Sequence, residues 1–335
     1  MLHKNFCCAI RTPLLCGVVL KMFAAGTAFL FRRHCAINRR WMNLARRYIK
    51  RLFLRDEGSE WNFFVFEERR TCFATQYPFG IFPKKELEVV DFDPITIFYG
   101  GNGSGKSTLL NIIAELAGVR RNSPFSSSSF FSRYLEECRL TGEKIPQDSE
   151  ILTSDDVSDY LLELRRLNGK IDGGRQALFD EYLERKVDNR NFVSMEDYDD
   201  WKRTCEAKSK SMSRFVRNHL AANVSLASNG ESAVYFFRRH IRENALYLLD
   251  EPENSLSIAY QEELRDFLVE SARCFGCQFI ISTHSPILLS IRQALIYDLD
   301  SVPVRTKMWT ELENVKKYFD FFEEHRYEFL KEEKK

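Results

Sequence analysis

The first 55 residues lack aspartate and glutamate altogether, although they hold 12 of the 49 lysines and arginines. The remaining 280 residues carry 37 basic and 48 acidic side chains, so the formal net charge of +1 hides an acidic body with a net charge of −11. An acidic body gives no reason from composition to expect a nucleic-acid-binding protein, and a DNA partner is unsupported by the net charge.

Other scarcities narrow the class of protein. Glycine (15) and proline (9) are too rare for a collagen-like or low-complexity chain, and 44% hydrophobic residues are too many for a disordered one. We find no internal repeat and no heptad run long enough for a coiled-coil arm. Nine cysteines, an odd number, do not indicate a disulfide framework. The composition therefore predicts a globular protein of a reducing compartment, and we expect it in the cytoplasm.

One long apolar run, residues 14–31, interrupts the basic segment. Its 18 residues are at the lower limit for a membrane span, and Lys21 near its centre would cost a few kcal/mol in a bilayer. Three interpretations stay open: a non-native or disordered extension, a membrane anchor, and a signal or transit peptide. We accordingly divide the chain into an extension at 1–54, one domain at 55–330 and a charged tail at 331–335.

A glycine-rich segment after residue 99 predicts a phosphate-binding loop. Residues 95–99 predict a buried strand, and leucine and isoleucine at helical spacing predict a helix over 109–118. The loop between them fits the pattern G-x-x-x-x-G-K-[ST]. Its candidate nucleotide-binding residues are Gly100, Asn102, Gly103, Ser104, Gly105, Lys106, Ser107 and Thr108.

The residue types of this loop suit a polyphosphate. Glycines let consecutive backbone N–H groups turn inward around the phosphates, and the start of the following helix adds partial positive charge. Lys106 is predicted to reach the β- and γ-phosphates of ATP, and the Ser107 hydroxyl is predicted to bind Mg²⁺.

Two further apolar strands end in residues suited to phosphate chemistry. Residues 245–249 predict a buried parallel strand that ends in Asp250 and Glu251, at the edge where α/β sheets place their ligands. Asp250 is the candidate Mg²⁺ ligand, and Glu251 is the candidate base that polarises the attacking water. Residues 278–282 predict a neighbouring strand, after which His284 is placed to reach a γ-phosphate, although a lone histidine at a strand end is more often structural.

Together these segments resemble the motifs of ATP-binding-cassette (ABC) ATPases. The matching residues are GGNGSGKST at 100–108, LLDEPENSL at 248–256 and STHSP at 282–286. They are more similar to the stand-alone AAA, RecF-like and SMC-like branch than to transporter subunits, which usually follow Asp-Glu-Pro with a threonine and a short Ala-Leu-Asp loop. The resemblance covers about residues 55–330. It implies a P-loop ATPase that uses ATP and Mg²⁺, with Lys106, Glu251 and His284 as catalytic residues.

The resemblance also implies a dimer in which a signature loop caps the ATP of the opposite subunit. Residues 227–232, Ala-Ser-Asn-Gly-Glu-Ser, are similar to the family's Leu-Ser-Gly-Gly-Gln. The sequence matches that motif at Ser228 and Gly230 and departs from it at Asn229 and Glu231. The candidate ATP-capping residues are Ser228, Gly230 and Glu231. A helix capping box of Ser228 and Glu231 is a compatible alternative.

Two elements of the resemblance are less distinctive. Gln147, in a Pro-Gln pair, is the candidate glutamine-loop ligand of Mg²⁺, but any Pro-Gln pair in a polar loop would look the same. Tyr99 or an earlier aromatic residue is the candidate for stacking on adenine, and the sequence does not single one out.

The expected architecture is an α/β P-loop core with a flanking antiparallel β subdomain and an inserted helical subdomain. Residues 61–92, which alternate aromatic and polar segments, predict the small antiparallel sheet. An insert at about 119–226 predicts helices over 155–167, 174–185 and 195–220. Residues 310–335, with Phe and Tyr at helical spacing, predict a packed helix with a charged tail.

The biological output is less constrained than the chemistry. We expect Mg-dependent ATP hydrolysis by a homodimer that drives an effector protein or a DNA-linked or defence process. Two alternatives stay open: the nucleotide-binding subunit of a transporter, which requires a membrane partner, and an ATP switch that signals by dimerising without hydrolysis.

Overall fold

A computed structural model describes residues 46–68, 70, 72–73, 75–187, 198–219 and 228–330. The chain divides into two units at Ala45 and Arg46, and all described residues belong to the second unit. The apolar run at 14–31 and the tail at 331–335 lie outside the described residues. Within the described part of the chain, no helix has the length and apolar character needed to cross a bilayer.

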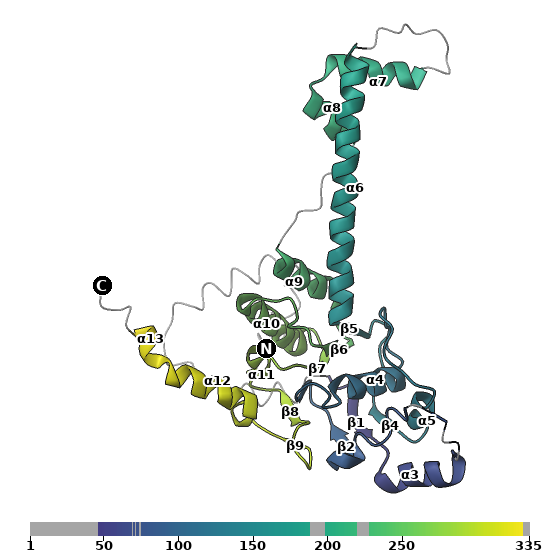
Figure 1. The fold of residues 1–335 in the computed structure, drawn as a ribbon, viewed down its shortest axis with the longest axis vertical. Helices are drawn as coiled ribbons and strands as arrows, with labels where there is room; N and C mark the ends of the chain where they lie inside the picture. The colour runs from purple at the N-terminus through teal and green to yellow at the C-terminus, as the bar shows by residue number, and fades with distance from the viewer. Residues whose placement is uncertain are drawn as a thin grey trace, which may run out of the picture. The chain divides into compact units, whose positions relative to one another are not determined.

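The core of the described unit is a six-stranded sheet in the order β5-β6-β7-β3-β8-β9 (Figure 1). Its strands are β3 (Ile95–Tyr99), β5 (Glu150–Thr153), β6 (Leu246–Asp250), β7 (Gln278–Ser282), β8 (Leu295–Asp298) and β9 (Arg305–Thr306). Neighbouring strands pair in parallel except β8 and β9. The predicted α/β class is confirmed, and β3 and β7 have the bounds that the sequence predicts.

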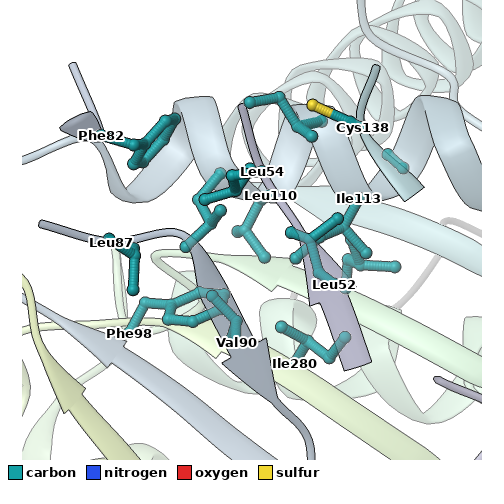
Figure 2. Packing of buried hydrophobic residues seen from close by; sticks show 14 of the residues in the cluster. Leu52, Leu54, Phe82, Leu87, Val90, Phe98, Leu110, Ile113, Cys138 and Ile280 are labelled. Atoms are coloured by element: carbon teal, nitrogen blue, oxygen red, sulfur yellow. The ribbon is translucent and has the colours of Figure 1, made fainter. Parts of the chain in front are cut away.

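Helices cover both faces of this sheet, which explains why its central strands are apolar throughout. On one face, α4 (Lys106–Ala117) packs Leu110 and Ile113 into a cluster that also contains Ile280 of β7, as Figure 2 shows. On the other face, α10 (Ile258–Cys274) contributes Leu264 and Leu268 to a second cluster. The remaining helices near the sheet are α9 (Asn229–His240), α11 (Pro286–Leu289) and the short α5 (Phe131–Leu135).

A three-stranded antiparallel sheet, in the order β2-β1-β4, packs against the other side of α4. Its strands are β1 (Ile49–Phe53), β2 (Val89–Asp91) and β4 (Arg139–Gly142). Buried Gln278 of β7 joins the two sheets. Its side-chain oxygen accepts the Ile49 N–H at 2.9 Å, and its amide donates to the Ile49 carbonyl at 2.8 Å.

The predicted boundary at residues 54 and 55 is wrong. Strand β1 lies inside the segment 1–54, and it is the central strand of the antiparallel sheet. Ile49 and Leu52 are fully buried in the core. The absence of acidic residues before Asp56 suggested a separate extension, but burial of Tyr48, Ile49 and Leu52 and the pairing of β1 place it in the unit that begins at Arg46.

The antiparallel subdomain itself is confirmed, but only β2 of its three strands comes from the predicted stretch 61–92. The aromatic segment there forms α3 (Glu57–Asn62) and the π-helix η1 (Phe63–Glu67). Asp56 caps α3 by accepting the Ser59 N–H at 2.6 Å. The aromatic rings pack on one another, with Phe63 stacked on Phe79 at 4.8 Å. Aromatic residues favour strands, but here they are packed from a helix instead.

The helical insert is confirmed, with different helix boundaries. It consists of α6 (Ser154–Val187), α7 (Tyr198–Ser209) and α8 (Met212–His219). The predicted helices at 155–167 and 174–185 are one continuous helix that runs through Gly169 and Gly173. The predicted helix at 195–220 is divided at residues 210–211, and its ends at 195–197 and 220 lie outside the described residues.

Packing at both ends keeps α6 continuous. Glycine costs about 1 kcal/mol relative to alanine inside a helix, and Gly169, Gly173 and Gly174 all lie within α6. The N-terminal part of α6 contacts α9, and its C-terminal part packs on α7 and α8 around Tyr182 and Phe215. These tertiary contacts outweigh the local preference of the three glycines.

The C-terminal stretch forms the 3₁₀ turn η4 (Trp309–Glu311) and the helices α12 (Glu313–Glu324) and α13 (Arg326–Leu330). The predicted C-terminal helix is confirmed, but the prediction that its aromatic side chains pack against the body is wrong. Leu312 and Val315 are buried against the body, whereas the Phe and Tyr side chains beyond Val315 are exposed.

The link through Gln278 gives a first testable prediction. Gln278→Leu removes both partners of the buried Ile49 backbone groups. We expect the free energy of unfolding to fall by about 2–4 kcal/mol, because each buried polar group left unpaired costs about 1–3 kcal/mol. Urea unfolding would measure the change. Gln147→Leu, at an exposed glutamine, is the matched control; equal effects of the two substitutions would show that the link carries no special weight.

Candidate functional site at the carboxyl edge of the parallel sheet

The phosphate-binding loop, residues 100–108, connects β3 to α4 at the carboxyl edge of the sheet. Gly103 and Gly105 have φ angles of +78° and +97°, which only glycine adopts without strain. Gly100 is tightly packed, since a Cβ there would lie 2.6 Å from Ser104 Oγ. That buried Oγ has no hydrogen-bond partner. The loop thus has a narrow backbone cradle and an unused buried hydroxyl, as a site for phosphate oxygens requires.

Lys106 is the first residue of α4, and its side chain is buried. Its Nζ donates to the carbonyls of Gly100 and Gly101, at 2.8 Å and 3.1 Å. The same Nζ lies 3.8 Å from Glu251 Oε1. The ammonium group is therefore held over the loop rather than in solvent.

Ser107 and Asp250 meet although they lie 143 residues apart. The Ser107 hydroxyl donates to Asp250 Oδ1 at 3.1 Å, and the Ser282 hydroxyl of β7 donates to the same oxygen. Burial raises the pKa of the Asp250 carboxyl above its ordinary value, while these two hydroxyl donors oppose the shift. A buried carboxylate that depends on donors for its charge would gain from a nearby cation.

The donor set fits Mg²⁺ better than a transition metal. A hydroxyl and a carboxylate are hard oxygen ligands, and protein-bound Mg²⁺ takes one or two such ligands together with waters and phosphate oxygens. Among the residues that the structure describes, no group of three or more His, Cys, Asp or Glu is arranged to hold a metal. Ser107 and Asp250 are the residues that would hold Mg²⁺ here.

Glu251 follows β6 in a strained conformation, with a φ angle of +49°. Its backbone N–H donates to the Ser282 carbonyl at 3.0 Å, which fixes the turn. Its carboxylate lies between two bases: Oε1 is 3.1 Å from His284 Nε2 and 3.8 Å from Lys106 Nζ. The structure therefore brings together the three residues that the resemblance assigns to catalysis.

Glu253 is a residue of the site that the sequence interpretation missed. Its buried carboxylate accepts the Thr283 hydroxyl at 2.6 Å and the backbone N–H groups of His284 and Ser285 at 2.9 Å and 3.2 Å. It thus fixes the turn from which the His284 side chain projects. The sequence did contain a signal for Glu253. It is an acidic residue close to the end of a strand predicted to be buried, and a buried carboxylate needs a hydrogen-bonding partner.

Two aromatic side chains border the loop. Tyr99 is buried, and its hydroxyl accepts the Asn314 N–H at 3.2 Å, so it is not available for stacking on adenine. The Tyr77 hydroxyl donates to Thr108 Oγ1 at 3.0 Å and holds that side chain. A carboxylate of Asp300, also missed in the sequence, accepts the Gly101 N–H at 2.8 Å.

The candidate signature residues lie at the start of α9. Ser228 caps the helix by accepting the Glu231 N–H at 3.2 Å, as the capping-box alternative expects of its hydroxyl. Gly230 allows a close approach, because a Cβ there would lie 2.4 Å from the ring of Tyr260 on α10. Ser228, Asn229 and Glu231 are exposed, so the amino end of α9 faces solvent. No contact joins these residues to the phosphate-binding loop of the same chain among the described interactions.

The predicted glutamine-loop role of Gln147 is not compatible with the structure. Gln147 precedes β5, which runs parallel to β6 with Thr153 opposite Asp250. It therefore lies at the amino edge of the sheet, whereas Ser107 and Asp250 lie at the carboxyl edge. Gln147 lies in a turn before β5, and the length of that strand, about 10 Å over Glu150–Thr153, separates it from the edge where Asp250 lies, so the structure places it away from the candidate metal ligands.

Two family models match the chain. The model described as "ABC transporter" matches residues 90–254, and the model described as "AAA domain, putative AbiEii toxin, Type IV TA system" matches residues 219–290. Over these residues the chain is similar to ABC-type and AAA-type ATP-binding domains, and the strand–loop–helix geometry of the site is of the P-loop kind. Its motifs agree with a stand-alone ABC/AAA-type ATPase, as the sequence predicted. No curated protein matches the chain.

Solved structures similar to the chain include an SMC head domain, an ATP-binding cassette and a part of an ABC transporter complex. The SMC head domain from Thermotoga maritima has 16% identity and a TM-score of 0.35, over 75% of this chain and 94% of that one. A dimeric ATP-binding cassette bound to ADP and Pi in a post-hydrolysis state has 18% identity and a TM-score of 0.32, over 67% and 90%. The cbiO1 protein of Clostridium perfringens has 18% identity and a TM-score of 0.31, over 70% and 87%.

The raised pKa of Asp250 gives a prediction for the nucleotide-free protein. Between the unfolded pKa, about 3.9, and the raised folded pKa, the folded state binds more protons than the unfolded state, so stability falls as pH rises. Asp250→Asn keeps an oxygen for the two hydroxyls and removes the buried charge. We expect a higher Tm at pH 7 in EDTA, with the advantage over the parent shrinking on acidification.

Asp148→Asn, at an exposed aspartate, is the control for this experiment. A lower Tm of Asp250→Asn at pH 7, or an advantage that does not depend on pH, would contradict the raised pKa of Asp250.

Proposed function

We propose that this chain binds Mg-ATP at the carboxyl edge of its parallel sheet, hydrolyses it, and acts as a homodimer. The observation that carries the proposal is the position of Glu251 Oε1, which lies 3.8 Å from Lys106 Nζ and 3.1 Å from His284 Nε2, together with the Ser107–Asp250 pair. A buried cation, a carboxylate held between two bases and a pair of hard oxygen ligands are the parts that phosphoryl transfer to water requires. We assign the ATPase domain to residues 46–330.

Each residue has a task in this reaction. The backbone of the loop and Lys106 bind the phosphates, for which Lys106 exchanges its present carbonyl partners. Ser107 and Asp250 hold Mg²⁺, which when bound neutralises charge on the phosphate oxygens. Glu251 accepts a proton from the attacking water, and the strained turn after β6 fixes its carboxylate in place. His284 orients that carboxylate through its Nε2.

A homodimer follows from the position of α9. Its amino end carries the exposed residues Ser228 and Glu231 beside the buried Gly230, and it has N–H groups with the partial positive charge that attracts a phosphate. Because these residues do not contact the phosphate-binding loop of their own chain, we infer that they cap the ATP of a second copy. ATP would then stabilise the dimer, and hydrolysis would release it.

We propose that the ATPase drives an effector protein. The AAA family model is described with a toxin of a Type IV toxin–antitoxin system, which supports a defence role for this chain. The cysteine usage supports a reducing, cytoplasmic compartment. The match to the ABC transporter model supports ATP binding, and it is equally compatible with the alternative that the chain is the nucleotide-binding subunit of a transporter.

Glu251→Gln tests the proposed base. The amide keeps the shape of the side chain but cannot accept the proton, so we expect ATP turnover to fall by about 10²–10⁴-fold. ATP should still bind, and repulsion between Glu251 and the γ-phosphate is removed. The dimer should therefore persist with ATP on a sizing column, while phosphate release measures turnover.

Lys106→Ala is the companion variant, and it should lose ATP binding itself because the cation of the loop is gone. Turnover by Glu251→Gln close to that of the parent would reject Glu251 as the base. A parent protein that binds ATP and dimerises without hydrolysis would replace the enzyme with an ATP switch.

Ser228→Arg tests the capping of ATP in trans. The bulky cation should leave ATP binding intact and abolish the increase in molar mass that ATP causes, as measured by light scattering with and without ATP in the Glu251→Gln background. Ser211→Arg, which changes another exposed serine just before a helix, controls for the cost of arginine at a helix start. If Ser228→Arg dimerises with ATP as Ser211→Arg does, Ser228 is only a helix cap.

A further inference from the structure

The C-terminal helices carry a large exposed apolar surface that the ATP site does not use. Seven large apolar side chains on α12 and α13 are each more than half exposed: Tyr318, Phe319, Phe321, Phe322, Tyr327, Phe329 and Leu330. Contiguous apolar surface of this kind on a folded protein marks an interaction site. In the ribbon, α12 and α13 lead away from the sheet at the end of the described chain (Figure 1).

The exposed residues of α12 continue a face that is buried at its start. Val315, Tyr318, Phe319 and Phe322 follow helical spacing and share one face. Leu312 and Val315 pack into the core, and the Asn314 N–H donates to Tyr99, so the first turn of α12 is fixed to the body. Beyond that turn, the ring contact of Phe322 with Phe329 of α13, at 6.2 Å, leaves Phe322 53% exposed, and Tyr318 and Phe319 are 54% and 64% exposed.

The charges beside this face are arranged for a second copy of the helix. Lys316 and Glu323, seven residues apart, lie on the same flank of the face, at angles of about 100° and 80° from Val315 at 100° per residue. An antiparallel copy places Lys316 of each helix against Glu323 of the other. A parallel two-fold copy places this flank of the two helices on opposite sides of the contact, so Lys316 and Glu323 do not meet. Both side chains are exposed, and the one contact of Glu323 is a long one, 3.4 Å to Arg326.

We propose that α12 pairs in antiparallel orientation with α12 of a second copy of this chain, about a two-fold axis near residues 319 and 320. Phe319 and Phe322 form the centre of the contact, and two Lys316–Glu323 pairs flank it. Such an isologous contact closes on itself. It is separate from the ATP-dependent contact through Ser228, so it forms without nucleotide.

The first test is the association state of the full chain in EDTA without nucleotide, measured by sedimentation equilibrium. We expect a reversible dimer. Phe319→Ser should weaken it by at least tenfold, whereas Phe66→Ser should leave it unchanged. Phe66 is the matched control, since it is 65% exposed against 64% for Phe319. A monomer throughout the micromolar range, or equal effects of the two substitutions, would overturn the proposal.

Charge reversal tests the antiparallel register and does not depend on a change in core packing. Lys316→Glu and Glu323→Lys should each weaken the homodimer by about tenfold, because each replaces two attractive pairs with two repulsive ones. The double variant should dimerise as the parent does, and an equimolar mixture of the two single variants should form heterodimers with the affinity of the parent. Single variants that dimerise normally, or a mixture without heterodimers, would reject this contact.

The same variants separate this proposal from the proposed ATPase. Lys106→Ala should retain the nucleotide-free dimer, and Lys316→Glu should retain ATP turnover per chain. Loss of the nucleotide-free dimer in Lys106→Ala would assign it to the ATP site and overturn the α12 contact.

Discussion

The parallel pairing of β6, β7 and β3 is the constraint on which the rest of the site depends. Parallel strands end at the same edge, so the residues that follow each of them are brought together whatever their distance in the sequence. Ser282, at the end of β7, donates its hydroxyl to Asp250 at the end of β6, and its carbonyl accepts the N–H of Glu251. The ends of two strands are thereby tied into one surface beside the phosphate-binding loop.

That surface concentrates charge in a small buried space. The Glu251 carboxylate compensates the burial of the Lys106 ammonium group, from which it lies 3.8 Å away, and also contacts the half-buried His284 at 3.1 Å. Glu253 does the same for the turn that carries His284, by accepting two backbone N–H groups. Pairing of this kind is required because an unpaired buried charge is costly. The price is a strained φ at Glu251, which is tolerated because the strands on both sides fix it.

The elements outside the core sheet differ in how firmly they are attached. The antiparallel sheet is held through α4 and through the two hydrogen bonds of Gln278. Helix α6 contacts α9 near its start and carries α7 and α8 near its end, so movement of the insert would reach the exposed start of α9 directly. Helix α12 is fixed only by its first turn. Among the described residues, the helical insert and α12 contact the core at one end only, so most of their surface is available for contacts with other chains.

The sequence alone determined the elements whose signal is local. The strand, glycine loop and helix at 95–118 were predicted because buried strands are continuously apolar and positive φ angles require glycine. The acids after β6 and the histidine after β7 were predicted because each follows a continuously apolar segment, which marks the end of a buried strand. Only the tertiary structure decided which distant residues are neighbours. It placed Gln147 at the wrong edge for a metal ligand, added Glu253 and Asp300 to the site, and kept α6 continuous through its glycines. In each case packing between segments far apart in sequence outweighed a local preference.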